Sequence, residues 1–118
     1  MDKWQAIQYF WEGFGIPAYD ENSVPDDAVE PYITYSAQVG DFESPLLLTG
    51  SLWYRSTSWE AISKKADEVA RNAKQLIRIS DGYLWLTRGS PFAQRMNDED
   101  DTVKRIYINV MAEFFTDY

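Results

Sequence analysis

Two pairs of closely spaced carboxylates are the side chains best suited to chemistry, Asp26 with Asp27 and Asp98 with Asp100. Paired carboxylates can divide acid and base roles, as in glycosidases, when an apolar environment raises the pKa of one member. Both pairs instead lie in polar stretches of the chain. We therefore interpret them as parts of solvated loops and predict no catalytic residues.

The composition removes most other catalytic chemistry. The chain contains neither histidine nor cysteine. This excludes the commonest general base, the Ser-His and Cys-His nucleophile systems, disulfides and cysteine-based zinc sites. Gly13 and Gly15 match the first two glycines of the dinucleotide fingerprint, but Tyr19 occupies the third position and a helix precedes them. The sequence thus predicts no enzyme activity and no cofactor.

The polar connector from Ile16 to Pro31 raises the question of metal binding, because oxygen-bearing side chains crowd into it. A calcium loop needs alternating acidic ligands, a central glycine and a terminal glutamate. The connector has none of these in the required order, so we predict no metal site.

The net charge of −8 argues against a nucleic-acid-binding surface and direct base readout. Tyr54, Arg55 and Trp85 could offer bases a stacking surface, but basic residues are too thinly scattered to support it. The first 50 residues hold nine acidic side chains and one basic, whereas the remainder is balanced. Either an acidic loop happens to lie early in the chain, or a negative face meets a positive partner. A DNA-mimicking inhibitor would need acidic surface that the second half does not supply.

Length and composition predict a single domain spanning residues 1–118, since chains of 118 residues normally form one. Aromatic residues make up 16% of the chain, enough for a core with some left for an interface. The N-terminus shows no secretory signal, and no apolar run approaches the length that spans a bilayer. We expect a soluble protein that folds in the cytoplasm of the cell that makes it.

Two helices are predicted from apolar residues at helical spacing. The first covers Asp2 to Phe14, with Asp2 as its N-cap. The second follows a capping box in which Thr57 is the N-cap and Glu60 the third helical residue, and it continues to about Leu76.

Strands are predicted where apolar and polar residues alternate or β-forming residues cluster. Gly50 indicates a bulge or a close backbone approach. The segments Ile16 to Pro31 and Arg88 to Thr102 read as irregular. We expect an α+β fold with a mostly antiparallel sheet and two main helices packed on one face. The expected strands are Tyr32–Val39 and Leu46–Ser56 as an antiparallel pair, Leu76–Ser80 and Tyr83–Thr87 as a hairpin around Asp81-Gly82, and Val103–Thr116 in the middle of the sheet.

Three segments resemble the tail terminator and tail-completion proteins that join head to tail in long-tailed bacteriophages. They are the N-terminal helix leading through the acidic connector into Pro31-Tyr32-Ile33-Thr34-Tyr35, the strand Leu48–Tyr54 running into the helix from Ser58, and the strand Arg105–Val110. Together they span most of the chain. They match as a pattern of architecture, without a sharp motif.

This resemblance implies a structural protein of a phage or prophage. Such a protein would form a homo-oligomeric ring, typically a hexamer, that caps the tail tube in the virion and joins it to the head-connector proteins. It implies that subunit edges and loops carry the function. The residues that combine charge or apolar area in the corresponding loops are Asp41, Glu43, Arg88, Phe92, Arg95 and Met96. Two alternatives remain open, a head–tail connector or minor capsid protein, and a small acidic inhibitor that binds a partner.

Overall fold

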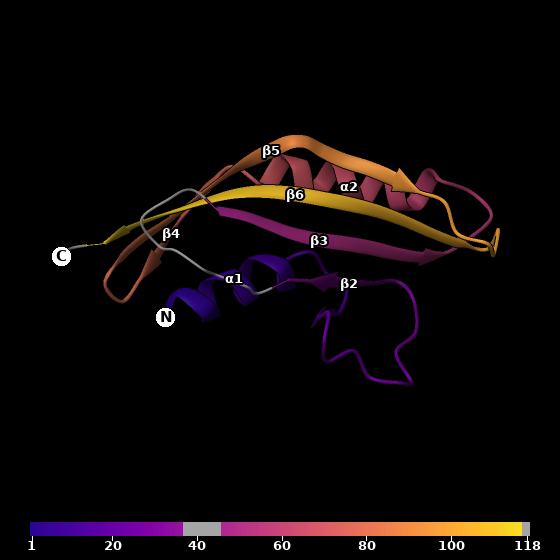
Figure 1. The fold of residues 1–118 in the computed structure, drawn as a ribbon, viewed down its shortest axis with the longest axis horizontal. Helices are drawn as coiled ribbons and strands as arrows, with labels where there is room; N and C mark the ends of the chain where they lie inside the picture. Colours follow the sequence, from indigo (N-terminus) through magenta and orange to yellow (C-terminus); the bar gives the residue numbers. More distant parts are fainter. Residues whose placement is uncertain (37–45, 117–118) are drawn as a thin grey trace.

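The computed structural model describes residues 1–36 and 46–116, which form two helices and a sheet of six strands (Figure 1). The helices are α1 (Lys3–Glu12) and α2 (Glu60–Asn72). The strands are β1 (Ala18–Asp20), β2 (Tyr32–Tyr35), β3 (Leu46–Arg55), β4 (Gln75–Ile79), β5 (Gly82–Met96) and β6 (Val103–Thr116).

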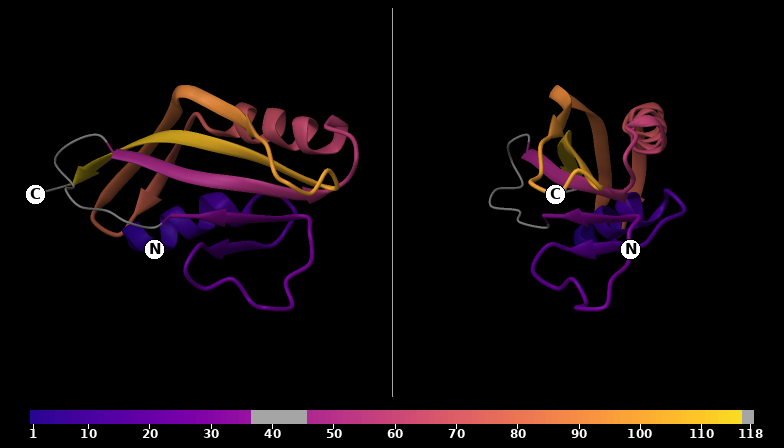
Figure 2. Two further views of the ribbon diagram at one scale, coloured as in Figure 1. Left: turned by 45° about the vertical axis from the view of Figure 1, so that its right-hand side comes forward. Right: turned by 90° about the vertical axis from the view of Figure 1, so that its right-hand side faces the viewer.

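The six strands lie in the order β1-β2-β3-β6-β5-β4, and the sheet curls into a half-barrel (Figure 2). The expected α+β class is confirmed, and β6 lies in the middle of the sheet as predicted, with β3 and β5 as its neighbours. The expectation of a mostly antiparallel sheet needs correction, because the sheet is mixed. The connector that was predicted to be irregular contains β1, and β1 runs parallel to β2.

The long axis of the molecule follows β5 and β6. These strands contain 15 and 14 residues. At about 3.4 Å per residue an extended strand of that length spans roughly 48 Å. The molecule is correspondingly 50 Å long and 28 Å by 23 Å across. Two long neighbouring strands therefore set the shape.

The core lies on the inner face of the sheet, because alternate residues of each strand point to that side. Residues of both helices belong to the same core cluster as the inward residues of the strands. The helices contribute Ala6, Ile7, Phe10, Trp11, Ile62, Ala66 and Val69, and the central strands contribute Leu48, Leu52, Leu84, Leu86, Ile106, Ile108, Val110 and Ala112.

Gly50 allows α1 to approach β3 closely. A Cβ atom at Gly50 would lie 2.7 Å from Cη2 of Trp11, closer than side chains tolerate. Trp11 is fully buried, and its ring stacks on Tyr35 with centroids 6.2 Å apart. The close approach predicted from this glycine is thus present, and an indole ring fills the space that a side chain would occupy.

The helix boundaries are partly as predicted. Asp2 caps α1 through a capping box with Gln5, which confirms the predicted N-cap. The predicted box on Thr57 is wrong, because α2 begins after Trp59 and the hydroxyl of Ser58 accepts the backbone N–H of Glu60. Helix α2 also ends at Asn72, well before Leu76, because the following residues pair with β5 as strand β4.

The predicted strand pairs are present, and one strand is longer than expected. β2 and β3 pair antiparallel, as do β4 and β5. Val39 lies outside the described residues. The segment after Arg88 was predicted to be irregular, but β5 continues to Met96. A register shift between Arg88 and Ala93 marks a bulge in the strand. The Gly-Ser-Pro sequence at the bulge is typical of loops, which is why the sequence predicted an irregular segment here.

Candidate functional site

The residues predicted to contact partners fall into two groups. Asp41 and Glu43 lie outside the described residues. The other four all lie on β5. Phe92 packs partly buried against the core, and Met96 is exposed.

Arg88 and Arg95 of β5 are exposed, and both form hydrogen bonds to α2. The Nε–H of Arg88 donates to the Ala70 carbonyl oxygen at 2.9 Å. The Arg95 guanidinium donates to the Ser63 hydroxyl at 3.3 Å and lies over the Trp59 ring, 4.9 Å from its centroid. Their charged groups thus stand along the side of the molecule where β5 and α2 meet.

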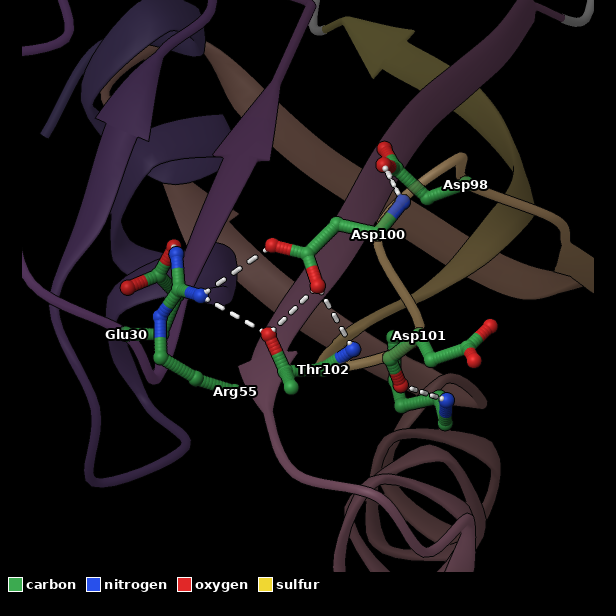
Figure 3. Close-up of polar contacts among 7 residues, drawn as sticks. Glu30, Arg55, Asp98, Asp100, Asp101 and Thr102 are labelled. Carbon is green, nitrogen blue, oxygen red and sulfur yellow. Dashed lines mark hydrogen bonds and ion pairs between the residues drawn. The ribbon is translucent and has the colours of Figure 1, made fainter.

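The carboxylates near Asp100 hold a turn together (Figure 3). Asp98 accepts the backbone N–H of Asp100 at 3.0 Å. Asp100 accepts the backbone N–H of Thr102 at 2.9 Å and its hydroxyl at 2.7 Å. These are local side-chain-to-backbone bonds of the kind that shape turns. The sequence-based interpretation of this acidic run as a turn is confirmed.

Arg55 joins this turn to the acidic connector (Figure 3). Its guanidinium donates to the Thr102 hydroxyl at 3.0 Å and lies 3.6 Å from a carboxylate oxygen of Asp100 and 3.4 Å from one of Glu30. The side chain of Arg55 is half exposed, so these ion pairs position the loops more than they stabilise the fold. Among the described residues, no group of three or more acidic side chains is arranged to hold a metal ion.

The hydrogen bonds from Thr102 lower the pKa of Asp100, and Arg55 lowers it further. A carboxyl whose pKa is depressed in the folded state contributes stability above its unfolded pKa, and that contribution is lost as the pH falls through the folded pKa. We expect Thr102→Val, which removes the hydroxyl donor, to raise the pKa of Asp100 towards its ordinary value. An NMR titration of the Asp100 carboxyl would measure the change, with Thr87→Val as the matched control. An unchanged pKa would contradict the assignment.

The structure separates the residues considered for base stacking. Tyr54 packs against the core on the inner face. Arg55 is engaged with the turn, and Trp85 lies on the outer face because its neighbours Leu84 and Leu86 are buried inside. These residues therefore do not share one surface.

A surface that sequence reasoning missed lies on the outer face, near the β4–β5 hairpin. Four large apolar side chains are exposed there, at 57% for Leu47, 55% for Leu76, 51% for Phe115 and 37% for Tyr83. The partly exposed Trp85 and Met111 connect them, since strand pairing places Leu47 beside Met111, Leu76 beside Trp85, and Tyr83 beside Phe115. We call these six residues the outer apolar patch. Charged side chains border it, because Glu113 pairs with Trp85 on the same face and the Arg78 guanidinium lies 4.8 Å from the centroid of the Tyr83 ring. Exposed apolar surface rimmed by polar residues is typical of protein–protein interaction sites.

The other end of the outer face differs, because its aromatic residues contact one another. The rings of Tyr32 and Trp53 stack at 6.4 Å, and the guanidinium of Arg105 covers the other side of Trp53 at 4.7 Å. The indole N–H of Trp53 donates to the Thr34 hydroxyl. This ladder stabilises the sheet through cross-strand pairs.

The described part of the chain contains no helix long and apolar enough to cross a membrane. No protein-family model matches the sequence, and no curated protein matches it significantly. The fold is similar to a chain in the solved structure of the virion of a native gene transfer agent particle. The TM-score is 0.62 with 18% sequence identity, over 89% of this chain and 83% of that one. At this identity the match defines the fold that the two chains share.

Proposed function

We propose that this chain is a non-enzymatic structural protein of a phage-like virion, where it caps the tail tube and joins tail to head through ring assembly. One observation carries the proposal. The fold matches a chain of a gene transfer agent virion over nearly the full length of both. The sequence resemblance to tail terminator proteins supports the same role independently of the structure.

The chemistry of the surface agrees with a role in assembly. Binding of a partner over the outer apolar patch would be favourable, because burial removes apolar area from water. The carboxylates Asp98 and Asp100, which were the best candidates for chemistry, are engaged in a turn. We assign the outer apolar patch to contact with the tail-tube protein, and we place the protein in the virion after its synthesis in the bacterial cytoplasm.

Inactivating the gene in a phage that carries it tests the capping role. A cap stops growth of the tube, so its loss should give tail tubes of abnormal length and heads without tails, visible by negative-stain electron microscopy. Complementation with the intact gene should restore normal particles. Normal infectious particles in the absence of the protein would overturn the proposal.

A further inference from the structure

Part of β5 presents an open strand edge. On one side β5 pairs with β6 along most of its length, whereas on the other it pairs with β4 only from Gly82 to Leu86. Among the described residues, no strand pairs with the second edge of Ala93–Met96. An open edge offers backbone N–H and C=O groups to another strand.

A groove beside this edge leaves room for an added strand. It encloses about 250 Å³ between α2 and the end of β5. Its floor includes the buried residues Ala66 and Ile106, and Ala93 and Arg95 stand at its rim. A strand added to β5 would continue the sheet beneath α2, and its inward side chains would fill the groove.

The sheet ends in β4 on one side and in β1 on the other, and β1 also has an open edge. Among the described residues β1 pairs only with β2. The register places Tyr19 on the outer face beside Thr34 and Asp20 on the inner face beside Tyr35. Figure 2 shows the connector that contains β1, drawn in purple, on the side of the sheet away from β5, drawn in orange.

The two edges differ in charge. The connector from Ile16 to Pro31 has five acidic side chains and no basic one: Asp20, Glu21, Asp26, Asp27 and Glu30. Beside Ala93–Met96, the exposed basic side chains are Arg88 and Arg95 of β5 and Arg71 of the last turn of α2. Asp67 lines the groove with them, and the acidic turn at Asp98–Asp101 follows Met96. The acidic side chains of the connector can pair with Arg71, Arg88 and Arg95 of another copy, which favours contact between the two different edges, and two acidic β1 edges would repel each other.

We propose that copies of this chain associate head to tail, with the β1 edge of one copy pairing with the Ala93–Met96 edge of the next. In this arrangement Tyr19 lies beside Gln94 or Met96 on the outer face, and Asp20 meets Arg95 on the inner face. A head-to-tail contact repeats around an axis, and it closes into a ring when the rotation per copy allows. The inference rests on the proposed function, because it supplies the contact from which the ring is built.

The absence of cysteine from the chain permits a clean cross-linking test. The double variants Tyr19→Cys with Gln94→Cys and Tyr19→Cys with Met96→Cys place one thiol on each edge, in the two adjacent outward positions. On oxidation, with tail-tube protein absent or added, we expect disulfide-linked multimers on a non-reducing gel. Tyr19→Cys with Phe115→Cys is the matched control, since Phe115 is exposed but lies away from β5's open edge. Circular dichroism would check that each variant is folded.

Multimers from either edge pair and few from the control would support the proposal. Monomers throughout, or equal cross-linking in the control, would overturn it. Light scattering shows whether a ring forms, independently of the cross-links. A ring that forms without edge cross-links would overturn the edge pairing and leave the proposed function standing. Reversing the connector charge with Asp26→Lys and Asp27→Lys should reduce cross-linking several-fold, and so should high salt.

Discussion

Replacing Trp11 with alanine is expected to lower the free energy of unfolding by about 3–5 kcal/mol, the usual cost of truncating a buried tryptophan. The Trp11 side chain is fully buried, contacts Gly50 and stacks on Tyr35, so its removal opens a cavity where α1 meets the sheet. A small domain is stable by only about 5–15 kcal/mol, so the loss is a large part of the total. Urea unfolding followed by fluorescence and circular dichroism would measure it.

The contact between Trp11 and Gly50 can be tested by combining substitutions at the two positions. Gly50→Ala should cost about 1–3 kcal/mol in the native chain, because its Cβ collides with the indole. In the Trp11→Ala background the same methyl group enters vacated space, so its cost should largely disappear. Gly13→Ala is the control, because its Cβ would meet only an ordinary contact. Additive effects of the two substitutions would contradict the contact.

Charged substitutions in the outer apolar patch should weaken binding to tail tubes by about 10-fold each, since loss of one interface anchor commonly costs more than 1 kcal/mol. Leu76→Asp and Phe115→Asp are the sharpest changes, because both side chains are half exposed and their loss should scarcely affect folding. Co-sedimentation with tail tubes would measure binding, and thermal unfolding would check stability.

Val29→Asp is the matched control for the patch, because Val29 is 75% exposed on the connector, away from the patch. Its binding should equal that of the native chain. Unchanged binding in the Leu76 and Phe115 variants would remove the patch from the assembly surface.

Much of the fold could be predicted from local patterns. The periodicity of Ile62, Ala66 and Val69 gave the buried face of α2, and Asp81-Gly82 gave the β4–β5 hairpin. Alternation gave β6 in the middle of the sheet. In each case the sequence signal and the tertiary contacts favour the same structure, which is why local reasoning succeeded.

The failures have a common physical origin in long-range pairing. β1 has three residues in a polar segment, and only its pairing with β2 makes it a strand. The end of β5 was missed because a bulge interrupts its alternation. Leu76 fits the helical period, yet the strand pairing of β4 places it on the outer face.

The contact role of the candidate site residues stays a prediction, and the structure shows only where they lie. Arg88, Phe92, Arg95 and Met96 were chosen for their mixed character, and the structure gathers them on β5, whereas Asp41 and Glu43 lie outside the described residues. The outer apolar patch was missed, although Tyr83 and Trp85 alternate with Leu84 and Leu86 in the sequence. Because both faces of this strand are apolar, alternation does not tell which face is buried, and the structure places Leu84 and Leu86 in the core and leaves Tyr83 exposed.

The most direct test of the assembly role is the solution mass of the purified protein by light scattering, across a concentration series and at two salt concentrations. The measurement would be repeated with the tail-tube protein added. We predict a closed ring near six subunits, or a monomer that becomes such a ring only with the tail tube. A strict monomer that ignores tail tubes would contradict the account.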